Sequence, residues 1–177
     1  MLGNGPLGLL TLAMLDDYDR TYCVGRRDRP DPTIDIVERL DATYVDSRET
    51  PVDEVPAVHE PMDFVYEATG HAEHAFETIE ALAPNGVGAL LGVPGDREFE
   101  VDGGTLHREF VLHNKALVGS VNSGVRHFER GVESVAALPE WFSDALVTGV
   151  YGLDEFERAF EVDDDTTIKT AVEFGST

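Results

Sequence analysis

Hydrophobic positions fall into short runs that alternate with longer segments of mixed polarity along almost the whole chain. The runs are nearly continuous, as expected for strands of a parallel sheet that is covered on both faces. They predict strands at 20–25, 42–46, 62–70, 87–93 and 116–122. The segments between them predict helices at 7–18, 31–40, 71–82, 105–114 and 125–138, with a short helical or irregular crossover at 52–58. This alternation predicts an α/β fold built on a doubly wound parallel sheet.

Two prolines and an aspartate mark where helices begin. Asp31 followed by Pro32 is a strong helix start, because the aspartate can accept the first unpaired amides and proline suits the first helical position. Pro6 suits the start of the first helix in the same way.

The end of the chain departs from the regular alternation. The segment 154–160 predicts a helix and 167–174 a strand, with no further strand–helix unit between them. We therefore divide the chain into a sheet domain at 1–146 and a C-terminal extension at 147–177.

The charge balance is strongly acidic and poor in lysine. Thirty-five acidic residues face thirteen basic ones, for a net charge of −22, and only Lys115 and Lys169 are lysines. Such a surface suits a protein working in concentrated salt, where a Debye length of about 3 Å screens self-repulsion. Nucleic acids and anionic membranes are poor partners for it. The alternative is a merely acidic protein from a low-salt cell.

The chain contains no apolar run of membrane-spanning length and no visible signal peptide. Its single cysteine, Cys23, rules out an intrachain disulfide; a buried apolar role suits it better than a nucleophilic one. These features favour a cytoplasmic location, here a high-salt cytosol.

The stretch GNGPLG at 3–8 is a candidate phosphate-binding loop. Gly3 permits a tight turn, Gly5 lets the backbone approach a pyrophosphate, and Gly8 lets a helix pack closely. The helix starting near Pro6 would point its positive end at the phosphates, as in Rossmann-type folds. The alternative is a purely structural glycine turn.

Two arginines follow the next predicted strand, where NAD-binding domains place a carboxylate on the ribose. Gly25 stands near that position, and Arg26 and Arg27 come directly after it. A small residue leaves room for a 2′-phosphate, and guanidinium groups bind phosphate in bidentate fashion. The pattern therefore favours NADP, with NAD secondary; solvated arginines are the alternative. The lack of an acidic residue at this position also argues against a methyltransferase, because methyltransferases share the glycine loop but usually place an acid on the ribose.

With these residues in place, the chain resembles the archaeal, halophilic-type glucose 1-dehydrogenases of the zinc-dependent medium-chain dehydrogenase superfamily. The resemblance covers essentially all residues, through GNGPLG, GRRDRPDPTIDIVERLDATYVDS, FVYEATG, LLGVPG, NKALVGSVNSGVRHFERG and TIKTAVEF. It is a resemblance to the C-terminal, cofactor-binding part of these enzymes. It implies oxidation of D-glucose to gluconolactone by hydride transfer to NADP.

The resemblance also implies which residues bind, all of them near the carboxyl ends of strands. The glycine loop at the pyrophosphate comprises Gly3, Gly5, Pro6, Leu7 and Gly8, with Arg26 and Arg27 at the 2′-phosphate. Thr69 and Gly70 would line the cofactor cleft, and its nicotinamide side would comprise Leu91, Gly92, Val93, Ser120, Val121 and Asn122. Asn122 would also reach the sugar substrate. Ordinary strand-end turns are the alternative for each group.

By the same resemblance, the zinc and catalytic domain precedes the glycine loop. We therefore expect no catalytic residue and no metal site here: His71 and His74 share a helix face without a third ligand, and His107, His113 and His127 suit surface or core positions. Only Met1 and Leu2 precede the loop, so we expect a sheet that lacks most of its first strand and has an open seam.

Three functions remain open at this stage. The first is the NADP-binding part of a glucose or related aldose dehydrogenase, inactive by itself. The second is a stand-alone NADP-binding regulatory module, and the third is part of another medium-chain alcohol or polyol dehydrogenase. A homo-oligomer is a further expectation, with the segment NKALVGSVN as its contact.

Overall fold

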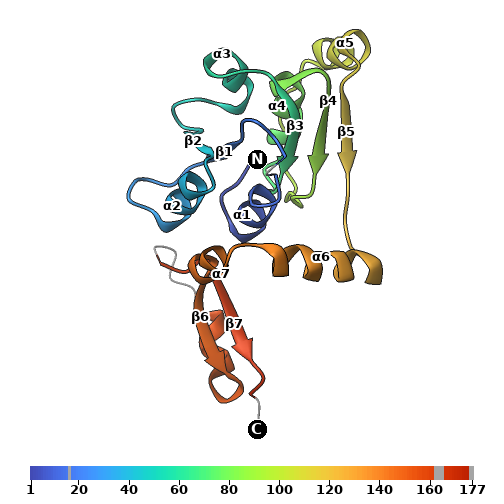
Figure 1. Cartoon of the computed structure of the whole chain (residues 1–177). Helices are drawn as coiled ribbons and strands as arrows, with labels where there is room; N and C mark the ends of the chain where they lie inside the picture. The colour runs from blue at the N-terminus through green and yellow to red at the C-terminus, as the bar shows by residue number, and fades with distance from the viewer. Residues whose placement is uncertain (16, 162–165, 176–177) are drawn as a thin grey trace.

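A computed structural model of the chain describes residues 1–15, 17–161 and 166–175. Its main sheet consists of parallel strands in two groups, β1–β2 and β3–β4–β5 (Figure 1). The strands are β1 (Tyr22–Gly25), β2 (Thr43–Asp46), β3 (Met62–Glu67), β4 (Leu82–Leu90) and β5 (Ala116–Gly119). The predicted α/β fold with a parallel sheet is confirmed.

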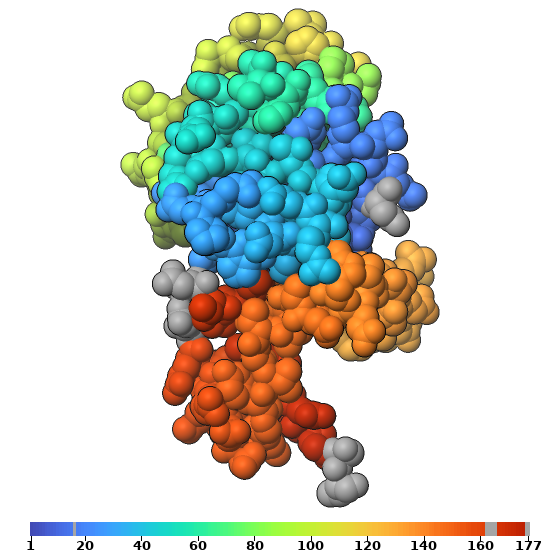
Figure 2. Space-filling model, turned by 60° about the vertical axis from the view of Figure 1, so that its left-hand side comes forward, coloured from blue at the N-terminus to red at the C-terminus, as the bar shows by residue number. Residues whose placement is uncertain are grey.

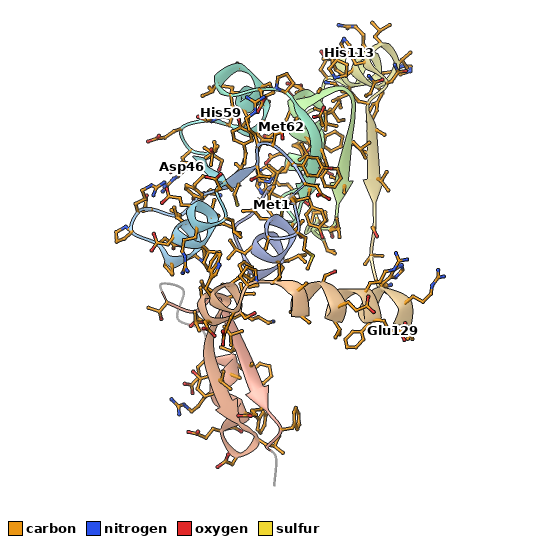
Figure 3. The ribbon with its side chains drawn as sticks, in the orientation of Figure 1. Met1, Asp46, His59, Met62, His113 and Glu129 are labelled. Carbon is orange, nitrogen blue, oxygen red and sulfur yellow. The ribbon has the colours of Figure 1, made fainter. Side chains whose placement is uncertain are left out.

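The first residues of the chain join the two groups of strands. Leu2 pairs in parallel with both Val24 of β1 and Glu67 of β3. Its N–H donates to the carbonyl of Tyr66 at 2.8 Å, and its own carbonyl accepts from Ala68 at 3.1 Å. Met1 therefore lies between the halves of the sheet (Figure 3). The sequence predicted a sheet that lacks most of its first strand. This prediction is wrong for the carboxyl end of that strand, which Met1 and Leu2 supply.

Toward the amino ends of β1 and β3 this pairing does not continue within the described residues. A hollow of about 40 Å³ lies there, between Tyr22 on one side and Met62 and Phe64 on the other. The open seam predicted from the sequence is thus confined to the region between the amino ends of β1 and β3.

Most of the helices form where the sequence predicted them. They are α1 (Pro6–Leu12), α2 (Pro32–Arg39), η1 (Val52–Glu54), α3 (Val55–Val58), α4 (His74–Ala81), α5 (Gly103–His113), α6 (Val125–Ala137) and α7 (Glu140–Leu146). Asp31 caps α2 as predicted, accepting the N–H of Thr33 at 2.8 Å, with Pro32 in the first helical position.

Neighbouring residues of β1 pack in two separate hydrophobic cores, because successive side chains of a strand point to opposite faces of the sheet. Cys23 belongs to a cluster with Leu9 of α1 and Phe142 of α7. The next residue, Val24, belongs to a second cluster with Val52 and other apolar residues. Burial raises the pKa of the Cys23 thiol to about 11, so it is an apolar core residue at neutral pH, as the sequence favoured.

Several predicted boundaries were wrong. The first helix ends at Leu12 rather than at residue 18, before the polar residues that follow Leu15. Strand β4 begins at Leu82, not 87, because the ladder tolerates the turn residue Asn85 (φ 67°) through a register shift opposite Met62 and Phe64. Strand β5 ends at Gly119, not 122.

The part of the chain from residue 140 onward contains elements that were not predicted from the sequence. Helix α7 and strand β6 (Val147–Gly152) had not been predicted. The expected helix at 154–160 is a 3₁₀ segment, η2 (Leu153–Phe160), with non-helical backbone at Glu155. Strand β7 (Lys169–Glu173) pairs in parallel with β6, and this small sheet projects away from the main one (Figures 1 and 2).

Candidate functional site

A cavity of about 470 Å³ opens beyond the carboxyl ends of β1, β2 and β3. Ligands of doubly wound sheets bind in this position, beyond the strand ends near the point where the strand order reverses. The lining residues are Leu2, Gly3, Asn4, Val24, Gly25, Arg26, Ser47, Arg48, Pro51, Val52, Thr69, His71, His74 and Glu77.

The glycine loop at the base of this cavity requires its glycines for different reasons. Gly3 has φ of 102°, a left-handed conformation that side chains rarely adopt. A Cβ on Gly8 would lie 1.9 Å from the carbonyl oxygen of Gly3, so helix α1 can approach the loop only without a side chain there. Gly5 is the N-cap of α1, and a Cβ at this position would meet no atom within 4 Å, so its face is open.

Gly25 is constrained by packing. A Cβ at this position would lie 2.7 Å from Asn4 Oδ1 and 2.9 Å from Tyr44 Cε2. From the sequence, the predicted reason for this glycine is room for a phosphate. The structure adds that a ribose-binding carboxylate cannot be placed here without displacing these neighbours.

The arginines after Gly25 take different positions. Arg26 lines the cavity and forms no ion pair with a carboxylate among the described residues. Arg27 is not a lining residue: its guanidinium lies 3.7 Å from Asp31, and the Tyr44 hydroxyl holds its backbone N–H at 2.8 Å. Of the two arginines that the sequence assigned to the 2′-phosphate, only Arg26 therefore lines the cavity in this structure.

Arg48 is a lining residue that the sequence analysis did not identify. It pairs with Asp46 at 2.5 Å and with Asp28 at 2.6 Å, and it lowers the pKa of Asp46 to about 2. Asp46 lies at the carboxyl end of β2, on the side of the sheet toward α2 (Figure 3). The signal was present: Ser47 and Arg48 directly follow the predicted strand 42–46.

The turn after β3 forms the opposite wall. Glu67 is buried and accepts the backbone N–H groups of Thr69 at 2.6 Å and Gly70 at 2.9 Å. Thr69 lines the cavity, whereas Gly70 does not. Gly70 has φ of 70°, and a Cβ on Gly92 would lie 2.1 Å from its nitrogen, so the turns after β3 and β4 touch.

Helix α4 and the residues just before it add the ionisable side chains of His71, His74 and Glu77 to the cavity wall. In the sequence, the two histidines were candidates only as metal ligands, and Glu77 was not identified. The rings of His71 and His74 lie 4.7 Å apart, and His74 Nδ1 lies 2.8 Å from the Thr69 hydroxyl. Burial, together with the nearby His71, lowers the pKa of His74. Burial and the charge of Asp53 raise the pKa of Glu77.

The residues predicted for the nicotinamide side lie farther along the same edge of the sheet. Leu91, Gly92 and Val93 follow β4, and the N–H groups of Leu91 and Gly92 donate to the Glu67 carbonyl. The second group follows β5 and comprises Ser120, Val121 and Asn122, the last with φ of 68°. None of the six lines the 470 Å³ cavity, and neither do Gly5, Pro6, Leu7 and Gly8.

Two features are absent from the described part of the chain. No group of three or more histidine, cysteine, aspartate or glutamate side chains there could hold a metal ion. No helix among the same residues is long and apolar enough to cross a membrane.

Known proteins resemble this chain over almost its whole length. Residues 1–174 match the family described as "Glucose dehydrogenase C-terminus". Glucose 1-dehydrogenase of Haloferax mediterranei is 68% identical over 180 residues, covering 99% of this chain and 50% of the relative. Glucose 1-dehydrogenase 1 of Haloterrigena turkmenica is 66% identical, covering 99% and 51%. The chain thus spans about half the length of the curated relatives it matches.

Solved structures show the same relationship. The Haloferax mediterranei glucose dehydrogenase in complex with NADP, Zn and gluconolactone matches with a TM-score of 0.94 and 67% identity, over 99% of this chain and 50% of that chain. A 2R,3R-butanediol dehydrogenase from Bacillus subtilis matches with a TM-score of 0.77 at 20% identity, which shows the shared fold alone.

Proposed function

Since the chain belongs to the glucose dehydrogenase C-terminal family, we propose that it is the NADP-binding part of a glucose 1-dehydrogenase. The observation that carries this proposal is the cavity beyond β1, where Arg26 forms no ion pair with a carboxylate of the described residues and Gly25 replaces the usual ribose-binding acid. A cationic group beside such a gap suits a 2′-phosphate, which a carboxylate would repel.

The glycine loop fits the diphosphate of such a cofactor. Gly5 presents an open face at the start of α1, so backbone amides can approach phosphate oxygens without a side chain between them. Pro6, Leu7 and Gly8 continue this first turn of the helix. Arg27 is the second candidate for the 2′-phosphate, and its guanidinium lies 3.7 Å from Asp31 in this structure.

The nicotinamide half would then follow the strand ends toward β4 and β5. The bound dinucleotide supplies the hydride acceptor, and this chain's residues hold and orient it. We assign the cofactor-facing positions there to Leu91, Gly92, Val93, Ser120, Val121 and Asn122, with Asn122 also toward the sugar. Residues 1–146 would form the cofactor domain, and 147–177 an extension that packs on the family's catalytic domain.

The substrate chemistry of the whole enzyme is D-glucose oxidation to gluconolactone. Hydride leaves the carbon that bears the sugar hydroxyl, and this step requires a group that acidifies the hydroxyl so that its proton can leave, a role that zinc fills in many enzymes. The described residues do not fit such a metal site. We therefore infer that this chain by itself binds cofactor without oxidising glucose.

Titration calorimetry in molar KCl tests the cofactor assignment. We expect NADP to bind the chain about tenfold or more tightly than NAD, and Arg26→Ala to remove the difference, since charge-assisted phosphate bonds contribute on the order of 1.5–3 kcal/mol. Arg130→Ala, an exposed position on α6, is the matched control. Equal affinity of the unaltered chain for both cofactors would exclude the proposal.

A stand-alone NADP-binding module is the second candidate. It is favoured by one observation: Met1 to Gly3 already join the two halves of the sheet, so the cavity is formed by this chain's own residues. Glucose-dependent reduction of NADP by the purified chain would exclude this module.

The protein's setting is inferred to be a high-salt cytosol, and a homo-oligomer through the β5 edge is a further proposal.

A further inference from the structure

A chain of hydrogen bonds connects a buried carboxylate to the α4 wall of the cavity. Glu67, 3% exposed, accepts the Thr69 hydroxyl in addition to two backbone N–H groups. The Thr69 oxygen lies 2.8 Å from His74 Nδ1 and also accepts the N–H of His71 at 3.0 Å. Thr69 and His74 both line the cavity.

These bonds assign the proton on the imidazole of His74. The single hydroxyl proton of Thr69 goes to Glu67, because the Oε1 atom that it contacts already accepts two backbone N–H groups and therefore acts as an acceptor. The Thr69 oxygen therefore meets Nδ1 of His74 as an acceptor, and Nδ1 must be the donor. In the neutral ring, Nε2 then keeps its lone pair and acts as an acceptor.

Glu77, one turn further along α4, places a second acceptor on the same wall. Its Oε2 lies 3.9 Å from Nε2 of His74, and both side chains line the cavity. A nitrogen between them could lie about 2.9 Å from each, a normal hydrogen-bond length. An NH₂ group satisfies both acceptors, whereas a carbonyl oxygen would face two lone pairs.

We propose that His74 Nε2 and the Glu77 carboxylate bind the 6-amino group of adenine and thereby select adenine over 6-oxopurine dinucleotides. This inference rests on the proposed function, which places the adenosine half of NADP in the cavity beside Arg26. It adds base selectivity to that site.

The charges around His74 are compatible with the neutral ring at neutral pH. Burial, His71 and Arg26 lower its pKa, while Glu67 and Glu73 oppose them. The titratable groups that face it are Glu67 from β3, Arg26 from the segment after β1, and His71, Glu73 and Glu77 from the α4 region. Acid would protonate Nε2 and convert the acceptor into a donor.

The experiment compares three ligands on the full chain at pH 7.5: NADP, its hypoxanthine (6-oxo) analogue and NAD. We expect NADP to bind at least about tenfold more tightly than the analogue, because the analogue leaves two acceptors unpaired. His74→Phe keeps an aromatic ring but removes the acceptor, so this ratio should fall to near one while the NADP-to-NAD ratio persists. His107→Phe, at an exposed position on α5, should change neither ratio.

The outcomes separate the two proposals. Equal binding of NADP and its 6-oxo analogue, with NADP still preferred over NAD, would overturn the adenine inference alone. Equal binding of NADP and NAD would remove the proposed function and this inference with it.

Nitrogen-15 NMR of the unaltered chain gives a second readout, which does not depend on a variant that folds. It should show His74 protonated on Nδ1 only, with an Nε2 signal that moves when NADP binds. A proton on Nε2 in the unbound chain would overturn the inference.

Discussion

The first hundred residues and the rest of the chain use similar apolar patterns with opposite results. In the first part, the strands and helices around Leu2, Cys23 and Val24 bury their apolar faces in two cores. In the described residues from 101 onward, the buried positions are only Lys115, Phe142 and Leu146. Both parts contain amphipathic helices, so the periodicity of a segment does not reveal whether its apolar face finds a partner.

Helix α6 shows the contrast most clearly. Its apolar stripe of Val125, Phe128, Val132 and Val135 is between 42% and 75% exposed, and none of its residues is buried. The helix extends sideways from the sheet, with Glu129 at its far side (Figure 3). Helix α2, with the same kind of pattern, buries Ile34, Ile36 and Val37. Stability should therefore depend on the first part far more than on the second.

The largest effect is expected from adding one methyl group at matched glycines in the two regions. Gly8→Ala places a Cβ 1.9 Å from the Gly3 carbonyl oxygen, so the loop and α1 cannot both keep their positions. We expect Gly8→Ala to abolish the cooperative urea transition, or to lower the free energy of unfolding by several kcal/mol. Gly131→Ala, on α6, meets nothing within 4 Å and should stabilise by up to about 1 kcal/mol. Equal effects would contradict the contrast.

A matched pair of phenylalanines should give the next largest effect. Phe142 is 1% exposed in the core with Leu9 and Cys23, so Phe142→Ala should cost about 3–5 kcal/mol of unfolding free energy. Phe128 is 70% exposed, and Phe128→Ala should stay within about 0.5 kcal/mol. Denaturant unfolding in molar KCl measures both. A large loss at Phe128 would show that α6 packs in solution.

A smaller effect, on pH dependence, concerns His74. Its pKa is lowered in the folded chain, so between that value and the ordinary value of 6.5 the unfolded chain binds more protons. Folding stability should thus decrease as pH falls below about 6.5 and level off once the folded imidazole is also protonated. His74→Phe should reduce this slope, whereas the exposed His107→Phe should preserve it. Thermal unfolding between about pH 8 and 5 is the measurement, and identical slopes in all three chains would contradict it.

Much of the first region could be predicted from local sequence signals. Asp31 and Pro32 specify the start of α2, and the continuous apolar runs specify β1, β2 and β3. The signals failed where tertiary contacts decide. Asn85 could have ended a segment, but the neighbouring strand accepts it through a register shift. Residues 140–152 lacked a strong start signal, and Phe142 became helical by packing into the first core.

The candidate site was predictable in position but not in its side-chain arrangement. The strand-end rule located Arg26 and Thr69 at one cavity. It could not foresee that Tyr44 and Asp31 hold Arg27 elsewhere, because both contacts come from other elements. The link between Glu67, Thr69 and His74 depends likewise on side-chain rotamers, which no sequence pattern encodes.

The position of Met1 has a practical consequence for anyone handling the protein. Its ammonium nitrogen is buried and donates to the carbonyl of Tyr22 at 2.9 Å. Any residue that precedes Met1 in a polypeptide would have to pass between β1 and β3 at the hollow beside Met62. A purification tag fused directly ahead of Met1 would therefore compete for space in the middle of the main sheet, whereas the small sheet of β6 and β7 projects away from it (Figure 1).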